Sequence, residues 1–258
     1  LNGANLYGVH LIGKDLRNTN LKNANFIGYK IDDEKWWDYL GLNRNGGIID
    51  PAGVDKFGEK LYATDLSGAD LREADLSGVN LSGIDISHAN LSDLDLSNTN
   101  IERANLSKTD LSGADLSGKN LSQVNLSGAD LFGADLTNAD LSGADLTNAD
   151  LSGADLTNAN LSFTNLENID FSNVKIKDVK LIGVKFTDMD LSGLDLSEKN
   201  LAGSSFLRTN LSEANLEKSN LSWANFEQVN LFNTNLKYAE LLRANLSEAD
   251  LSNTDLEY

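Results

Sequence analysis

The chain of 258 residues has no cysteine, one proline and two histidines. Without cysteine, disulfides, thiolate metal sites, iron–sulfur clusters and thiol nucleophiles are excluded. No apolar run approaches the roughly 18–20 residues of a membrane-spanning helix, so we expect no membrane span. Lys and Arg number 21 against 39 Asp and Glu, a net charge of −18, which argues against direct nucleic-acid binding through phosphates. Because a chain without cysteine fits either redox environment, the compartment is open, and the cytoplasm is our expectation.

A five-residue repeat runs through almost the whole sequence. Every fifth residue from Leu61 to Leu256 is Leu, Ile or Phe, and the same phase runs from Leu1 to Ile31. The residue two positions earlier is usually small, and the residue directly before is mostly Asp or Asn. Ser or Thr follows, and then commonly Gly or Asn. The consensus is Ala-(Asp/Asn)-Leu-(Ser/Thr)-(Gly/Asn).

A period of five fits neither a helix nor a flat strand. On a helix the leucines would precess around the axis and form no stripe, and in a strand an odd spacing sends successive leucines to opposite faces. Leucine and the small residue can share one interior only if the chain turns every five residues. The Asp, Asn, Ser, Thr and Gly positions supply that turn chemistry. We therefore predict a solenoid coiled around a leucine-filled axis.

The stretch 133–141, with the sequence GADLTNADL, shows the repeat most clearly. It closely resembles the pentapeptide-repeat family, as does the rest of the chain outside residues 32–60. The resemblance implies an all-β fold, a right-handed quadrilateral parallel β-helix of about 12 coils of 20 residues, with one pentapeptide per side. It also implies that the Leu and small phases point inward and the other three phases face solvent. We predict one continuous solenoid domain, made of repeats in 1–31 and 61–258.

Residues 32–60 depart from the repeat, and we predict an insertion with a short helix over residues 32–40 and a loop over residues 43–53. Insertions in solenoids often map to binding faces, so Trp36, Trp37 and Tyr39 are candidates for contact with a partner. The alternative is that these rings fold back onto the coils or bury one another. Phe163 and Trp223, which stand at solvent-facing phases, are further candidates; single exposed aromatics are also ordinary.

The Asp/Asn phase divides unevenly among the four sides of a 20-residue coil. In two neighbouring columns, residues 70 to 190 and 75 to 195 in steps of 20, 12 of 14 residues are Asp, against four of 14 in the other two. This segregation supports four sides per coil and predicts two adjacent acidic columns. With coils about 4.8 Å apart, neighbouring carboxylates repel, and we expect some of their pKa values to be raised.

Two interpretations of the acidic columns stay open. In the first, the columns collect cations or a basic partner; in the second, tandem duplication has simply copied Asp. We predict no metal centre and no cofactor; the candidate ion ligands, if any, are Asp110, Asp115, Asp130, Asp135, Asp150 and Asp155.

The coil around Lys175, Lys180 and Lys185 replaces Asp/Asn by Lys on three successive sides. Its inward small positions also swell to Ile and Val, so we predict a wider coil with a basic belt, whose simplest role is to neutralise Asp170 and Asp190. Lys119 and Lys199 occupy inward positions, and either extend outward or distort the wall.

No catalytic constellation is present, so we do not expect an enzyme. The leading hypothesis is a rigid acidic scaffold for an unknown protein partner; end-to-end stacking of copies is possible but not predicted. One alternative is a DNA-mimic regulator of a DNA-binding protein such as gyrase, because the chain resembles the pentapeptide-repeat proteins that protect gyrase from quinolones. Those proteins dimerise through a C-terminal hydrophobic module, whereas residues 251–258 continue the repeat. A cation-binding acidic surface is a third hypothesis.

Overall fold

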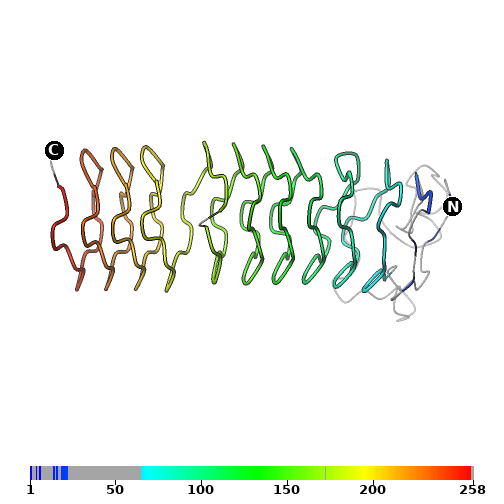
Figure 1. Cartoon of the computed structure of the whole chain (residues 1–258), viewed down its shortest axis with the longest axis horizontal. Helices are drawn as coiled ribbons and strands as arrows, with labels where there is room; N and C mark the ends of the chain where they lie inside the picture. Colours follow the sequence, from blue (N-terminus) through cyan, green and yellow to red (C-terminus); the bar gives the residue numbers. More distant parts are fainter. Residues whose placement is uncertain are drawn as a thin grey trace, which may run out of the picture.

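The computed structural model describes residues 65–171 and 173–256 and, before them, Leu1, Ala4, Leu6, Lys14, Leu16 and 19–22. The described chain forms a stack of coils along one long axis (Figure 1). No helix occurs in the described ranges, and the β structure consists of isolated bridges, one on each side of a coil. The predicted short helix and the rings of Trp36, Trp37 and Tyr39 lie outside the described residues.

Parallel bridges join residues that are 20 apart, as in Asp110 to Asp130 and Asn125 to Asp145. Each bridge residue belongs to the Asp/Asn phase, so four pentapeptides complete one coil, as predicted. A further bridge joins Asn20 to Asp75, and the Leu21 N–H donates to the Asp75 carbonyl at 3.0 Å. Repeats from before and after residues 32–60 therefore lie against each other in one stack.

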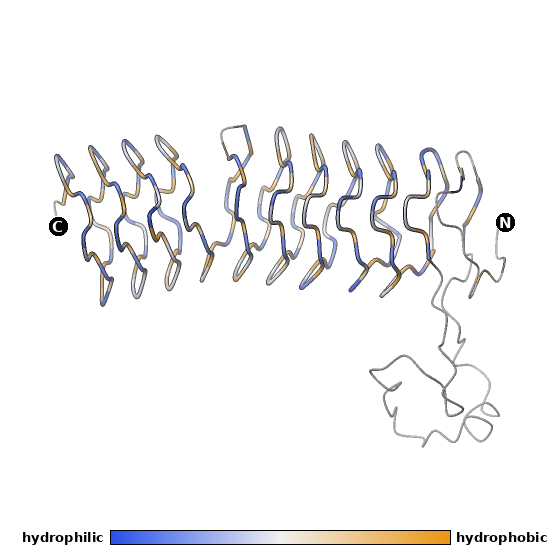
Figure 2. Cartoon of the chain, turned by 90° about the horizontal axis from the view of Figure 1, so that it is seen from below, coloured by the Kyte–Doolittle hydropathy of each residue, from blue (hydrophilic) through white to orange (hydrophobic). Residues whose placement is uncertain are grey.

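The leucine and small phases fill the interior. In the central coils, Leu136 and Ala134 are fully buried, and their equivalents are buried with them. Phe186, Phe206 and Phe226 take the leucine phase in successive coils and stack with ring centroids 5.0 and 4.8 Å apart. Those distances are the spacing of the coils. Apolar and polar segments accordingly alternate at short, regular intervals around each coil (Figure 2).

The turn chemistry explains the other three phases. An Asp or Asn Oδ1 accepts a hydrogen bond from the N–H two residues later, as in Asp135 to Thr137 at 2.9 Å and Asn120 to Ser122 at 3.1 Å. One residue further on, the backbone takes a left-handed φ, 65° at Gly133 and 59° at Asn138. Gly and Asn adopt this conformation at least cost, which is why they dominate that phase.

The ladder of bridges is interrupted where the inward residues are large. Among the described residues, no bridge or main-chain hydrogen bond joins 170–182 to 189–201. Here the Ala of regular coils is replaced by bulkier side chains, and Val174, Ile176 and Leu194 are only partly buried. A closely packed interior absorbs such added volume only at a cost in packing, and the main-chain hydrogen bonds between these two described segments are lost. The predicted swelling thus coincides with an opening between two coils.

Lys119 opens the ladder in the same way. No main-chain hydrogen bond joins the described segments 98–103 and 117–122; instead Lys119 Nζ donates to the Thr99 carbonyl at 2.8 Å. The bridge between Lys180 and Asn200 is likewise absent beside Lys199. Of the two alternatives for the inward lysines, the structure therefore shows a local distortion of the solenoid wall beside them.

No helix in the described part of the chain is long and apolar enough to cross a membrane.

Candidate interaction surfaces

The two predicted acidic columns exist as neighbouring sides of the solenoid. Bridges connect Asp110, Asp130 and Asp150 in one column, and Asp115, Asp135 and Asp155 in the next. We call these six residues the acidic face. Because the backbone bridges lock their coils together, the carboxylates are held in rows whose spacing follows the coil spacing.

Each carboxylate of the acidic face is tied to its own turn. The Ser117 N–H donates to Asp115 Oδ1 at 2.9 Å, and the Thr157 N–H donates to Asp155 Oδ1 at 3.0 Å. Hydrogen bonds from Ser152 lower the pKa of Asp150. Hydrogen bonds from Thr157, together with Lys175, lower the pKa of Asp155 to about 2.

The expectation that repulsion raises the carboxylate pKa values is therefore wrong for Asp150 and Asp155. Hydrogen bonds to a carboxylate stabilise its charged form, and here they outweigh repulsion between well-solvated neighbours. These carboxylates stay ionised well below neutral pH. Among the residues that the structure describes, no three acidic or histidine side chains converge in a group that could hold a metal ion.

In the basic belt, Lys175 pairs with an aspartate of the preceding coil, and Asp190 is held by uncharged donors. Lys175 Nζ forms an ion pair with Asp155 Oδ2 at 3.0 Å, in the preceding coil of the same column. Asp190 accepts hydrogen bonds from the Ser192 N–H and from Asn210 Nδ2, each at 3.0 Å. The basic belt therefore lies directly after the last residue of this column of the acidic face, Asp155, and neutralises its charge.

Phe163 and Trp223 are exposed by 68% and 59% and occupy the same corner, three coils apart. A Cβ on Gly183 would come within 2.6 Å of the Phe163 ring, so that ring lies directly over Gly183. The Arg243 guanidinium sits 4.5 Å from the centroid of the Trp223 ring, a distance typical of a cation–π contact. The structure thus brings these two predicted residues to one edge of the rod.

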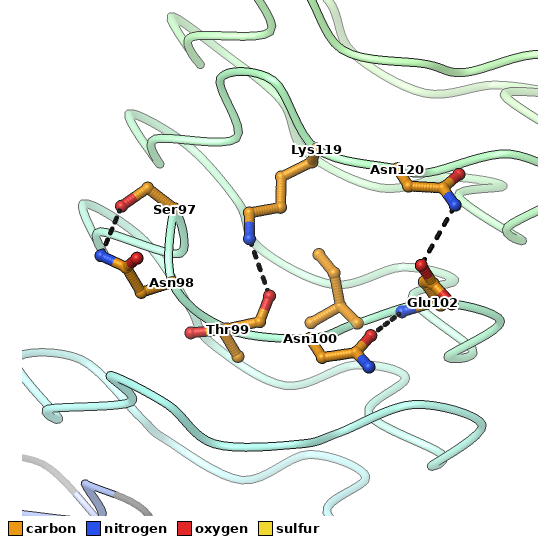
Figure 3. A pocket seen from close by; sticks show the side chains of 8 residues that line it. Ser97, Asn98, Thr99, Asn100, Glu102, Lys119 and Asn120 are labelled. Atoms are coloured by element: carbon orange, nitrogen blue, oxygen red, sulfur yellow. Dashed lines mark hydrogen bonds between the residues drawn. The ribbon is translucent and has the colours of Figure 1, made fainter.

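The opening at Lys119 forms a cavity of about 300 Å³ that the sequence did not predict (Figure 3). Side chains span it: Lys119 reaches the Thr99 carbonyl, and Asn120 Nδ2 donates to Glu102 Oε1 at 3.1 Å. Burial lowers the pKa of Lys119, and the nearby charges of Asp95 and Asp115 oppose this. The feature of the sequence that could have indicated this cavity is the lysine at an inward position that is normally small.

The repeat also matches a known family along most of its length. The family model for pentapeptide repeats matches in eight copies, at residues 1–31, 60–93, 80–118, 120–153, 134–173, 149–188, 190–228 and 224–257. A search of curated proteins found no match.

Two solved structures are similar. HetL, a pentapeptide repeat protein involved in heterocyst differentiation regulation from the cyanobacterium Nostoc sp. strain PCC 7120, is 33% identical, with a TM-score of 0.41, covering 74% of this chain and 84% of HetL. QnrB1, a plasmid-mediated fluoroquinolone resistance protein, is 21% identical with a TM-score of 0.54, covering 70% of this chain and 91% of QnrB1. Confirming the sequence-based resemblance and the predicted fold, the chain belongs to the pentapeptide-repeat family and is a right-handed quadrilateral parallel β-helix.

Proposed function

We propose that the chain is a non-enzymatic scaffold that binds a basic protein partner through its acidic face. One observation carries this proposal: the fold does not need the charge. Asn120 makes the same turn hydrogen bond as Asp135, at 3.1 against 2.9 Å. An Asn column would therefore build the same wall without repulsion, and the ionised rows require another explanation.

The physical properties of the acidic face suit such a partner. Asp150 and Asp155 keep their charge well below neutral pH, since their pKa values are lowered. Their rows are rigid, so a partner loses little free energy in ordering them. Complementary charge accelerates association and fixes the register of a complex. A surface rich in Lys and Arg is the matching chemistry.

A set of charge-neutral variants tests the proposal. Asp→Asn at all six positions of the acidic face preserves the turn bonds, and a random-peptide library is panned on the wild type. We expect lysine- and arginine-rich peptides to be enriched and to lose at least about tenfold in affinity for the variant. The control removes six charges elsewhere on the coils, as Glu→Gln at Glu102, Glu198, Glu217, Glu227, Glu240 and Glu248. Equal loss in both variants would reduce the effect to net charge and contradict a defined face.

A second candidate is mimicry of DNA, in which the rows of carboxylates replace phosphates at a DNA-binding protein. The regular charge spacing on a rigid rod favours it, and the fold is that of QnrB1. Supercoiling by gyrase is the assay: inhibition by the wild type that the Asp→Asn variant lacks would support mimicry. Unchanged supercoiling in excess protein would remove gyrase as the target.

A further inference from the structure

One corner of the rod differs from the others in its side chains. In the central coils the two residues at this corner are Ser followed by Gly or Gln. Between Phe163 and Leu242 most residues at these two positions are apolar or are glycine. The row comprises the exposed or half-exposed Phe163, Ile182, Gly183, Ala202, Gly203, Trp223 and Leu242. We call this set the aromatic corner.

The aromatic corner is rigid even where the neighbouring ladder is open. Main-chain N–H groups donate along the row: Phe163 to the Ile182 carbonyl at 2.8 Å, Gly183 to Ala202 at 3.0 Å, and Trp223 to Leu242 at 2.8 Å. The Phe163 ring lies over Gly183, whereas a Cβ on Gly203 would meet nothing within 4 Å. Between the two aromatic residues, the corner therefore consists of small side chains on a backbone that is held by hydrogen bonds.

The charge beside the aromatic corner is opposite to that of the acidic face. On the two flanking sides, the Asp/Asn-phase residues from 180 to 245 include Lys180 and Lys185 as cations and Glu240 as the anion. Arg243 adds a third cation on the corner itself. Neither Lys180 nor Lys185 forms an ion pair among the described residues. A chain of net charge −18 thus has a locally cationic strip beside its exposed rings.

We propose that the aromatic corner is a second docking surface, separate from the acidic face, and that its occupant is an extended acidic peptide segment of a partner. Charge complementarity selects acidic residues, and the rings select apolar side chains. Trp and Arg are enriched among the residues that contribute most to the binding free energy of protein interfaces, and Trp223 with Arg243 supplies such a pair. Neither ring serves the core, and both residues hold a left-handed φ, 63° and 65°, which costs more for an aromatic than for the consensus Gly or Asn.

The spacing of the two residues sets the spacing of the partner's side chains. Three coil steps of 4.8–5.0 Å place the backbones of Phe163 and Trp223 about 14–15 Å apart, and an extended peptide advances about 3.4 Å per residue. Four residues cover that distance, and residues four apart point to the same face of an extended chain. The expected segment therefore has two apolar residues separated by three others, with Asp or Glu among or beside them.

The test uses the full chain and the consensus of its own repeat. Phe163→Asn with Trp223→Asn removes both rings and installs the residue that takes this φ at Asn138 and Asn158, so folding is preserved. Phe132→Ser is the matched control, because Phe132 is 59% exposed but lies on another corner. Circular dichroism and thermal melting of all three proteins check the fold.

The probe is the same random-peptide library, panned on the wild type. We expect a class of acidic peptides with the four-residue apolar spacing, which loses at least about tenfold in affinity for the double variant and none for Phe132→Ser. Lys180→Asn with Lys185→Asn should weaken the same peptides, less at high salt. Sedimentation velocity measures self-association in parallel.

Three outcomes would overturn the inference. The first is that panning enriches no class of acidic peptides, and the second is that the acidic peptides bind the double variant as well as the wild type. The third is self-association that the double variant abolishes, which would make a second copy of the chain the occupant. Enrichment of basic peptides alone, lost in the Asp→Asn variant, overturns this inference while supporting the acidic face, so the two proposals fail separately.

Discussion

The coils from 105 to 165 and the coil from 166 to 185 share one repeat but differ in their walls. In the first region bridges follow one another on every side, from Asn105–Asn125 to Asp145–Asn165. In the second, the bridges toward the next coil are missing on three successive sides. The leucine phase is apolar in both, whereas the inward small phase is mostly Ala in the first region and is Ile or Val on all four sides of the second. A single Val or Ile at this phase keeps its main-chain hydrogen bond to the next coil, as Val124 and Ile84 do, so the coils open where several successive small-phase residues are bulky.

The largest expected effect of a single substitution breaks the regular region. Leu136→Ala removes a fully buried side chain and leaves a cavity in closely packed coils, which costs about 2–5 kcal/mol of unfolding free energy. Ile176→Ala, in the open coil where the side chain is only partly buried, should cost clearly less. Chemical denaturation of both variants measures the difference. Equal losses would show that the open coil is as well packed as the regular one.

A transplant of bulky residues should convert one region into the other. Ala134→Val with Ala139→Val and Ala144→Val introduces added volume into a regular coil, at about 1–3 kcal/mol each. We expect faster amide exchange at Asp155 and Asn160, whose N–H groups donate to the carbonyls of Ala134 and Ala139. Hydrogen exchange read by NMR checks this. Unchanged protection would mean that a regular wall absorbs the volume without opening.

A smaller effect concerns the junction of the acidic face with the basic belt. The pKa of Asp155 is lowered from its ordinary 3.8 to about 2, so its ionised form stabilises the fold above about pH 4, and that contribution is lost as the pH falls through about 2. Asp155→Asn should lower stability slightly at pH 6, within about 1 kcal/mol for an exposed pair, and not at about pH 1, below the pKa of Asp155 in the folded protein. Thermal melts across this range, with Lys175→Asn as the partner variant, measure it. A difference that persists in full at about pH 1, where Asp155 is protonated, would contradict the ionic origin.

The smallest expected effect is that of divalent cations on the acidic face. The carboxylate Oδ1 atoms of Asp115 and Asp155 already accept turn hydrogen bonds, so we expect calcium or magnesium to leave Tm unchanged at matched ionic strength. A saturable rise in Tm, absent from the six-residue Asp→Asn variant, would instead support the cation-binding hypothesis.

The sequence predicted the coil, the inward phases and the columns, because a repeat of five with four sides leaves little freedom. The lowered pKa values of Asp150 and Asp155 do not follow from the column spacing, because they depend on hydrogen bonds within each turn. The sequence shows that Lys119 departs from the small-residue phase. It does not show that the main-chain hydrogen bonds at this position are replaced by a bond from Lys119 Nζ to the Thr99 carbonyl, because that depends on how the coils lie in space. The contact of the Phe163 ring with Gly183 depends likewise on a rotamer that no spacing specifies.

In this structure, the residue at the inward small phase controls whether neighbouring coils form main-chain hydrogen bonds. Amide exchange beside Lys119 tests this control most directly. In the wild type, Ile101 and Asn120 have no main-chain partner across the opening, whereas the Leu121 and Asp140 N–H groups donate to neighbouring coils at 2.7 and 2.8 Å. We predict that Ile101 and Asn120 exchange at least about tenfold faster than Leu121 and Asp140, and that Lys119→Ala, which restores the consensus, removes the difference. Equal protection of all four amides in the wild type, or an unchanged difference in Lys119→Ala, would contradict it.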